Sequence, residues 1–362
     1  MINHRPHSLL LKKFKILYNF FKKRIFISGD DIFFFGAGFS KSLNNSYPTL
    51  AELSEYFLAH NLIEQNKEVY KDNLEQLLTY LITPLPFKTR EEILENEASY
   101  IKKIKKIGKY FLNLKNKDII NLNDNIKTLS RFINENKCTC ITLNYDLLLE
   151  EMLFLTLDKK VSEGNVYNIF YKMPIKYIDE RTEVAQQGFN FFNDNLNNGK
   201  KNSTEIIKLH GSINWYCDQI YQNSPIYFYS HNISKESEEY QKIIGKESLR
   251  QLIIPPILDK TSNYNHIEIQ SLWKKAFKAI QKAKNIYIYG FSFPITDLSV
   301  VYLFKSALQN KQDYKIYVIN TKHDIGNKKK RYKEIFGKGK CDFSFCCDDN
   351  LEKLAKHLNK KC

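Results

Sequence analysis

Four short motifs, far apart in the chain, combine glycines with polar side chains that could hold a ligand and act on it. They occupy residues 36–40, 142–146, 209–212 and 290–292. Each follows a run of apolar residues that is typical of a buried β-strand. Because ligands of open parallel sheets bind beyond the carboxyl ends of the strands, we expect the four motifs to line one pocket. Their glycines, hydroxyls, amide, carboxylate and histidine suit a ligand that carries phosphates and sugars.

The first motif begins with Gly36, Ala37 and Gly38. Such a turn after a strand lets a phosphate approach the backbone closely, and Ser40 adds a hydroxyl that could donate to it. Lys41 stands where a dehydrogenase fingerprint has its third glycine, and no acidic residue is evident at a strand end about 20 residues later. This departure disfavours hydride transfer. The alternative interpretation is a tight turn without a ligand.

Three side chains in the second and third motifs could carry a reaction. The Asn144 amide could hold a water molecule or a ribose hydroxyl, and the Asp146 carboxylate could accept hydrogen bonds from a ligand amide. Of the eight histidines, only His210 ends a clear predicted strand beside glycine and serine. Since imidazole titrates near neutral pH, His210 could act as a general base. The alternatives are structural: Asn144 shapes a turn, Asp146 caps a helix, and His210 is a satisfied core residue.

The fourth motif and the strand that follows it offer further polar groups. Gly290 and Ser292 could bind phosphate or ribose oxygens. Asn320 ends the next predicted strand and could hydrogen-bond a second ribose. We expect Asp297 to cap the helix that starts beside it.

The elements that must position these groups alternate between strands and helices. Apolar runs predict strands that end near residues 35, 141, 209, 289 and 319. This alternation predicts an α/β fold with a Rossmann-like, doubly wound parallel sheet. About ninety residues with helical patterning separate the first strand from the second, far more than a crossover needs, so we expect a large helical insertion.

The chain is therefore expected to have four parts. Residues 31–46 together with 135–347 form the Rossmann core, and residues 47–134 form the helical insertion, as a lid or small domain. Residues 1–30 form a basic helical segment, because apolar residues recur at helical spacing between lysines. Residues 348–362 form a C-terminal helix that packs on the core.

Composition narrows the class of protein. The formal charge of +15 and the pI of about 9.2 favour acidic partners, but the lysines are spread over polar helix faces. No nucleic-acid module is recognisable, so nucleic acid is only weakly suggested. The seven cysteines include no C-x-x-C pair, which argues against a zinc site. Their odd number without a secretory signal suggests reduced thiols in the cytoplasm. The apolar run near the N-terminus is too short for a signal peptide or a membrane span.

The motifs, in this order over residues 31–320, resemble the sirtuin-like (Sir2-like) family, and its bacterial defence-associated NAD-hydrolase branch rather than its lysine deacylases. The resemblance is carried by GAGFS at 36–40, NLEQLL at 73–78, TLNYD at 142–146, KLHGSINW at 208–215 and YGFSF at 289–293. It implies that the core binds NAD, with Asn144 and His210 matching the catalytic pair. The other matched positions are Gly36, Ala37, Gly38 and Ser40 for the pyrophosphate, Asp146 for the nicotinamide amide, and Gly290, Ser292 and Asn320 as further cofactor-binding residues, the last two near the adenosine half.

The resemblance also implies a reaction and its setting. Water would cleave the nicotinamide–ribose bond of NAD to give nicotinamide and ADP-ribose, without a metal. The enzyme would be the NAD-depleting effector of an antiviral, abortive-infection system. It would form a homo-oligomer and respond to a partner such as a HerA-like ATPase or an Argonaute protein.

Two alternatives stay open. The first is an NAD-dependent protein deacylase, although this sequence lacks the two cysteine pairs of the deacylases' zinc module. The second is a non-catalytic, nucleotide- or nucleic-acid-associated subunit that uses the lysines within residues 102–106 and the basic run 328–331.

Overall fold

The computed structural model describes residues 30–60, 73–115, 123–157, 170–173, 176–178, 204–218, 226–229, 249–323 and 325–361. The predicted basic segment 1–30 therefore lies, except for residue 30, outside the described residues. Within the described ranges, no helix is both long enough and apolar enough to cross a membrane.

The core is a six-stranded sheet in which neighbouring strands are parallel throughout. In spatial order the strands are β10 (Cys341–Asp342), β9 (Lys315–Ile319), β8 (Asn285–Tyr289), β1 (Asp31–Phe35), β2 (Thr139–Thr142) and β4 (Glu205–Lys208). From β1 the chain moves outward to β2 and β4, then returns to β8 on the other side of β1. The order reverses between β1 and β8, which is the switch point of a doubly wound sheet. The predicted Rossmann-like α/β fold is confirmed.

The centre of the sheet is held by apolar and aromatic side chains. All five residues of β1 are buried, as expected for a central parallel strand that is covered on both faces. Phe33 of β1 stacks on Tyr287 of β8, and Tyr287 stacks on Tyr317 of β9, each with ring centroids 4.7 Å apart. These three residues are also paired in register across the strands. The aromatic row therefore fixes the register of the central strands.

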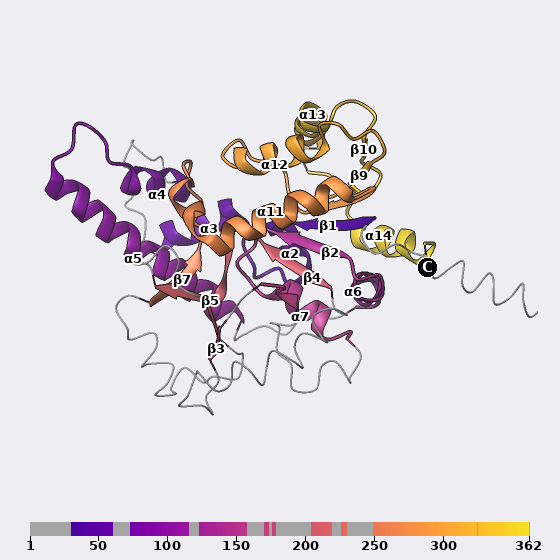
Figure 1. The fold of residues 1–362 in the computed structure, drawn as a ribbon, viewed down its shortest axis with the longest axis horizontal. Helices are drawn as coiled ribbons and strands as arrows, with labels where there is room; N and C mark the ends of the chain where they lie inside the picture. Colours follow the sequence, from indigo (N-terminus) through magenta and orange to yellow (C-terminus); the bar gives the residue numbers. More distant parts are fainter. Residues whose placement is uncertain are drawn as a thin grey trace, which may run out of the picture.

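Helices cover both faces of this sheet (Figure 1). One face carries α6 (Asp124–Glu135), α7 (Leu148–Phe154) and α14 (Asn350–Asn359), and the other carries α11 (Ile267–Lys282), α12 (Leu298–Leu308) and α13 (Ile325–Phe336). In α6, Ile126, Leu129 and Ile133 recur at helical spacing and are buried.

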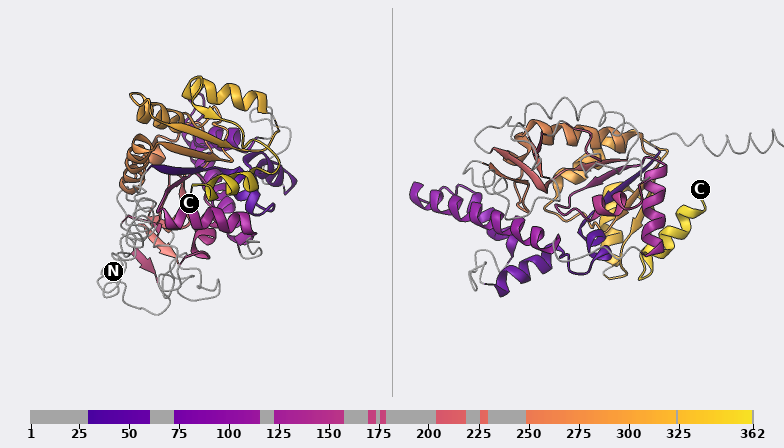
Figure 2. Two further views of the ribbon diagram at one scale, coloured as in Figure 1. Left: turned by 90° about the vertical axis from the view of Figure 1, so that its right-hand side faces the viewer. Right: turned by 90° about the horizontal axis from the view of Figure 1, so that it is seen from below.

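Helices also fill the long connection between β1 and β2. They are α2 (Ala37–Leu43), α3 (Leu50–Ala59), α4 (Leu74–Ile82) and α5 (Arg90–Lys115), ahead of α6. Helix α3 begins with a capping box formed by Thr49 and Glu52. The N-terminal part of α5 projects beyond the rest of the described chain (Figures 1 and 2). The assignment of this segment as a separate small domain or lid stays a prediction.

From β4 the chain passes directly into a second sheet, which the sequence did not predict. Its strands are β3 (Lys176–Ile178), β6 (Tyr227–Tyr229), β5 (Gly211–Asp218) and β7 (Leu249–Ile253), in that spatial order. Strand β5 starts only three residues after β4 ends, so the chain leaves one sheet and enters the other through Leu209 and His210. At this corner Gly211 has φ +75°, and a Cβ on it would lie 1.9 Å from the Leu252 carbonyl oxygen. Only glycine fits there.

The turns after β1 and β8 touch each other through their backbones. The Gly36 N–H donates to the Tyr289 carbonyl at 2.9 Å, and the Gly38 N–H donates to the Gly290 carbonyl at 3.0 Å. Gly290 has φ +66°, and a Cβ on it would lie 2.2 Å from the backbone nitrogen of Phe39. At the switch point of the sheet, the backbones of the two glycine-containing turns are therefore in direct contact.

We predict that Gly290→Ala destabilises the fold far more than Gly337→Ala. Both glycines have positive φ, which costs an alanine about 1–2 kcal/mol. Gly337 has open space where a Cβ would be, whereas Gly290 has backbone atoms there. Overpacking should add about 1–3 kcal/mol or more at Gly290 only. Urea denaturation of both variants checks this, and equal losses of unfolding free energy would contradict it.

Candidate active site

All ten residues singled out from the sequence line one cavity of about 790 Å³. They are Gly36, Ala37, Gly38, Ser40, Asn144, Asp146, His210, Gly290, Ser292 and Asn320. They follow the carboxyl ends of β1, β2, β4, β8 and β9, so the cavity lies across the switch point of the sheet. The structure thus brings the four motifs together, while the role of each residue stays a prediction.

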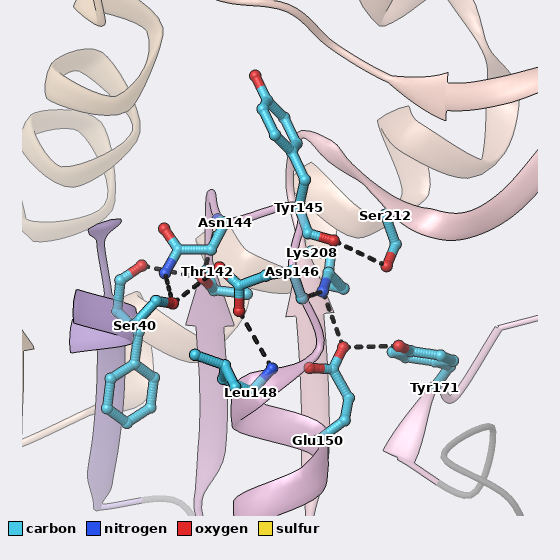
Figure 3. Close-up of polar contacts among 11 residues, drawn as sticks. Ser40, Thr142, Asn144, Tyr145, Asp146, Leu148, Glu150, Tyr171, Lys208 and Ser212 are labelled. Atoms are coloured by element: carbon cyan, nitrogen blue, oxygen red, sulfur yellow. Dashed lines mark hydrogen bonds and ion pairs between the residues drawn. The ribbon is translucent and has the colours of Figure 1, made fainter. Parts of the chain in front are cut away.

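A chain of hydrogen bonds joins the first motif to the second (Figure 3). Asn144 Nδ2 donates to the Gly36 carbonyl and to Ser40 Oγ, both at 2.9 Å. Ser40 Oγ donates in turn to Asp146 Oδ2 at 2.8 Å. The two amide hydrogens of Asn144 are therefore used within the protein, and its Oδ1 remains to accept a hydrogen bond from a ligand or water.

This chain of bonds changes what Ser40 and the glycines can offer a phosphate. The hydroxyl hydrogen of Ser40 is directed to Asp146, and the N–H groups of Gly36 and Gly38 are directed to the turn after β8. The missing side chains of the two glycines make room for that turn: a Cβ on Gly36 would lie 2.6 Å from the Gly290 carbonyl oxygen, and one on Gly38 would lie 2.9 Å from the Gly290 Cα. Ser40 holds Asp146 in place.

Asp146 is buried and is supported from below by a second set of polar groups (Figure 3). Burial raises the pKa of its carboxyl above the ordinary value, against the opposing effects of Lys208 and the Ser40 hydrogen bond. Lys208 Nζ donates to the Asp146 backbone carbonyl and pairs with Glu150 Oε1 at 2.8 Å. Tyr171 donates to the same Glu150 oxygen at 2.6 Å. The loop after β2 is thereby tied to β4 and α7.

His210 lies at the corner between the two sheets. Its side chain is 5% exposed, and Nε2 has no hydrogen-bond partner within the described part of the chain. The rings of Tyr264 and Trp273 each lie 6.5 Å from the imidazole, measured between centroids. Burial lowers the pKa of His210 to about 4. The imidazole is therefore neutral at pH 7 and keeps a lone pair that can accept a proton.

The loops after β8 and β9 form another part of the wall. Ser292 is exposed at the cavity, and Asn320 Oδ1 accepts hydrogen bonds from Thr321 N at 2.9 Å and from Lys328 Nζ at 3.2 Å. Hydroxyl, amide and ammonium groups of this kind bind sugar hydroxyls and phosphate oxygens.

The prediction that Asp297 caps α12 was wrong for its side chain. Asp297 stands at the N-cap position but makes no capping hydrogen bond. Its Oδ1 instead accepts from Lys260 Nζ at 2.9 Å. A buried ammonium needs a counter-charge, and this ion pair outweighs a hydrogen bond to a helix N–H.

Sequence reasoning also missed charged residues that the structure places at the site. Lys208 and Glu150 each interrupt an apolar run, which is a local signal that a buried partner exists. Lys260 and Glu75 also line the cavity, but no local pattern distinguishes them from surface residues.

Together these side chains can position a water molecule and stabilise positive charge on a sugar ring. The Asn144 oxygen and the neutral His210 can orient or deprotonate water, and the Asp146 carboxyl can accept from a ligand amide. Within the described ranges, no group of three or more His, Cys, Asp or Glu residues is arranged to hold a metal ion.

Comparison with known proteins points to one family. A family model described as a SIR2-like domain matches residues 139–337, which is more than half of the chain. No curated protein matches the chain.

Two similar solved structures are both sirtuins. One is a Sir2 in complex with the inhibitor EX-527, 2'-O-acetyl-ADP-ribose and a deacetylated p53 peptide, at 12% identity over 91% of this chain and 93% of that chain, with a TM-score of 0.34. The other comes from work on the structural basis of sirtuin substrate affinity, at 13% identity over 97% of this chain and 98% of that chain, with a TM-score of 0.36. These similarities are too distant to carry an argument about function.

We predict that Lys208→Met lowers the unfolding free energy by about 3–5 kcal/mol, because it leaves the buried Glu150 carboxylate without its counter-charge. The two side chains are 1% and 0% exposed. Lys208→Met combined with Glu150→Gln should recover most of this loss, since Gln still accepts from Tyr171. Lys356→Met, at an exposed pair with Glu352, should cost less than about 1 kcal/mol. Urea denaturation measures all three, and equal costs for Lys208→Met and Lys356→Met would contradict the prediction.

Proposed function

This chain belongs to the family of SIR2-like domains, and on that premise we propose that it is an NAD+ glycohydrolase. The observation that carries the proposal is the meeting of Asn144, Asp146 and His210 with the glycine turns of β1 and β8 at one cavity. Its volume of about 790 Å³ lies within the range of about 300–1,000 Å³ that is usual for small-molecule sites.

The proposed binding mode follows from the groups on each part of the wall. The pyrophosphate lies at the turn of Gly36 to Ser40, beyond the carboxyl end of β1. Asp146 accepts a hydrogen bond from the nicotinamide amide, and Ser292 and Asn320 contact the adenosine half. This places the nicotinamide–ribose bond on the side of the cavity that holds Asn144 and His210.

The proposed reaction needs few catalytic groups. The pyridinium nitrogen loses its positive charge when the bond to ribose breaks, so nicotinamide leaves as a neutral molecule and needs no general acid. The charge passes to the ribose in an oxocarbenium-like transition state, as in other glycosidic cleavage. Asn144 orients the attacking water through its Oδ1, and the neutral His210 accepts a proton from it.

We place this activity in a cytoplasmic, NAD-depleting effector of an antiviral, abortive-infection system. The support is the resemblance of the five motif segments to that branch of the family. None of the six described cysteines is in a disulfide bond, which suits a reducing compartment. A homo-oligomer and a partner such as a HerA-like ATPase or an Argonaute protein belong to the same proposal.

We predict that purified protein incubated with NAD+ releases nicotinamide and ADP-ribose, and that Asn144→Ala and His210→Ala each reduce the rate by about 100-fold or more. Chromatography of the products measures this, with Lys356→Met as the matched surface control. Turnover like that of the unchanged protein in both site variants would remove the assignment.

The same assay separates the alternatives. Nicotinamide release that strictly requires an acylated peptide would favour a deacylase. No NAD turnover, together with salt-dependent DNA binding, would favour a nucleic-acid-associated subunit.

We predict that kcat/KM for NAD+ stays constant from pH 7 down to about 5.5, because His210 must be neutral and an ordinary histidine would lose activity near 6.5. With a pKa of about 4, the imidazole is protonated only below that range, so the acid limb moves down and not up. Circular dichroism at each pH confirms that the protein is folded. An acid limb centred near pH 6.5 would show that buried, neutral His210 is not the group that limits the rate.

A further inference from the structure

A cluster of charged side chains lies in the cavity wall, and the proposed reaction gives it no role. It consists of Glu75 in α4, Lys260 between β7 and the short helix η2 (Ser262–Asn265), and Asp297 at the start of α12. The side chains of Lys260 and Asp297 are only 4% and 15% exposed. Because removing charges from water is costly, such a cluster is expected where its position matters.

Hydrogen bonds fix the geometry of the cluster. Lys260 Nζ donates to Asp297 Oδ1 at 2.9 Å and to the Thr296 carbonyl at 3.3 Å. The carboxyl of Glu75 hydrogen-bonds the side chain of Thr296. The turn before α12 is therefore held from two sides, by Lys260 and by the insertion.

The same lysine is connected to the surroundings of His210. The Lys260 carbonyl accepts the backbone N–H of Asn263 at 3.0 Å and of Tyr264 at 3.2 Å, so Lys260 begins the turn that forms η2. The Tyr264 ring packs on Trp273, with centroids 4.9 Å apart, and both rings lie beside His210. Anchoring Lys260 to Asp297 thus anchors the aromatic wall that buries the imidazole.

The ion pair also sets the charge around His210. Asp297 and Lys260 are the charged groups that act on the imidazole, and their effects on its pKa oppose each other. The other titratable groups near the pair are Glu75, Tyr264 and Tyr145, and burial raises the pKa of all three. The two tyrosines stay neutral near pH 7, and Glu75 is not among the groups that act on His210. Removing either charge would leave the other uncompensated in a poorly solvated site.

We propose that Lys260 and Asp297 are positioning residues for His210: their ion pair holds the η2 turn against the imidazole and balances the charge around it. This inference rests on the proposed role of His210 in NAD hydrolysis. It assigns a task to two residues that do not themselves act on the reacting bond.

The test is an NMR titration of the full chain labelled with ¹³C-histidine, in which His210→Gln identifies the His210 signal. Lys260→Met should raise the titration midpoint of His210 by roughly half to one pH unit, because Asp297 is left uncompensated. Asp297→Asn should lower it, so that His210 stays neutral at the lowest pH at which the protein is folded. The double variant should return the midpoint close to that of the unchanged protein.

Matched variants exclude a merely structural effect. Lys260→Arg keeps the charge and should keep the midpoint. Glu75→Gln alters the same cluster but not a charge that acts on His210, so it should leave the midpoint in place. If Lys260→Met does not fold, Asp297→Asn still decides, since its amide oxygen can accept from Lys260. Unchanged midpoints in Lys260→Met and Asp297→Asn, or shifts in the same direction, would overturn the proposal.

The kinetic readout distinguishes this inference from the proposed function. If the protein hydrolyses NAD+, the acid limb of kcat/KM should move with the NMR midpoint in each variant, and kcat should fall more than KM changes. Because the titration needs no turnover, lack of hydrolysis would count against the proposed function alone. The titration would then still decide whether Lys260 and Asp297 control His210.

Discussion

The contact between two backbone turns at the switch point is the constraint on which the cavity depends. Gly36 and Gly38 after β1 donate to the turn that contains Gly290 after β8, and no Cβ fits between them. This approach sets where α2 begins, and hence where Ser40 meets Asn144 and Asp146. A parallel sheet delivers strand ends to one edge, but only glycines allow two of those ends to touch.

Two buried ion pairs hold the other parts of the site in place. Lys208 and Glu150 lie under the loop after β2, and Lys260 and Asp297 lie beside His210. Buried ion pairs contribute little net stability. Moving or removing one partner is nevertheless costly in free energy, because it leaves the other charge buried without compensation. Among the described cavity-lining residues, His210 differs, because its Nε2 is buried without a hydrogen-bond partner. Within the described cavity lining, His210 Nε2 is therefore left to interact with a ligand or a water molecule.

Local sequence patterns predicted the parallel core and the ten cavity residues. An apolar strand followed by glycine and polar residues can be recognised from a short stretch of sequence alone. The second sheet escaped prediction, since β5 pairs with β7 across a long separation in sequence that no local period records. Lys260 and Asp297 lie 37 residues apart, and the residues around each one contain no pattern that predicts the ion pair. The sequence correctly indicated that Asp297 stands at the N-cap of α12. An N-cap pattern does not show which group the side chain contacts.

The helical insertion is part of the site and not only an appendage to the core. Glu75 of α4 and Phe111 of α5 line the cavity, and Glu75 hydrogen-bonds the turn that carries Asp297. Helix α5 also packs on β7, where a Cβ on Gly108 would overlap the Gln251 side chain. Helix α5, whose N-terminal part projects beyond the rest of the described residues (Figure 2), is therefore joined through packed elements to the cavity wall. A partner that displaced α5 would have to move part of the cavity wall with it, because α4 and α5 pack against each other.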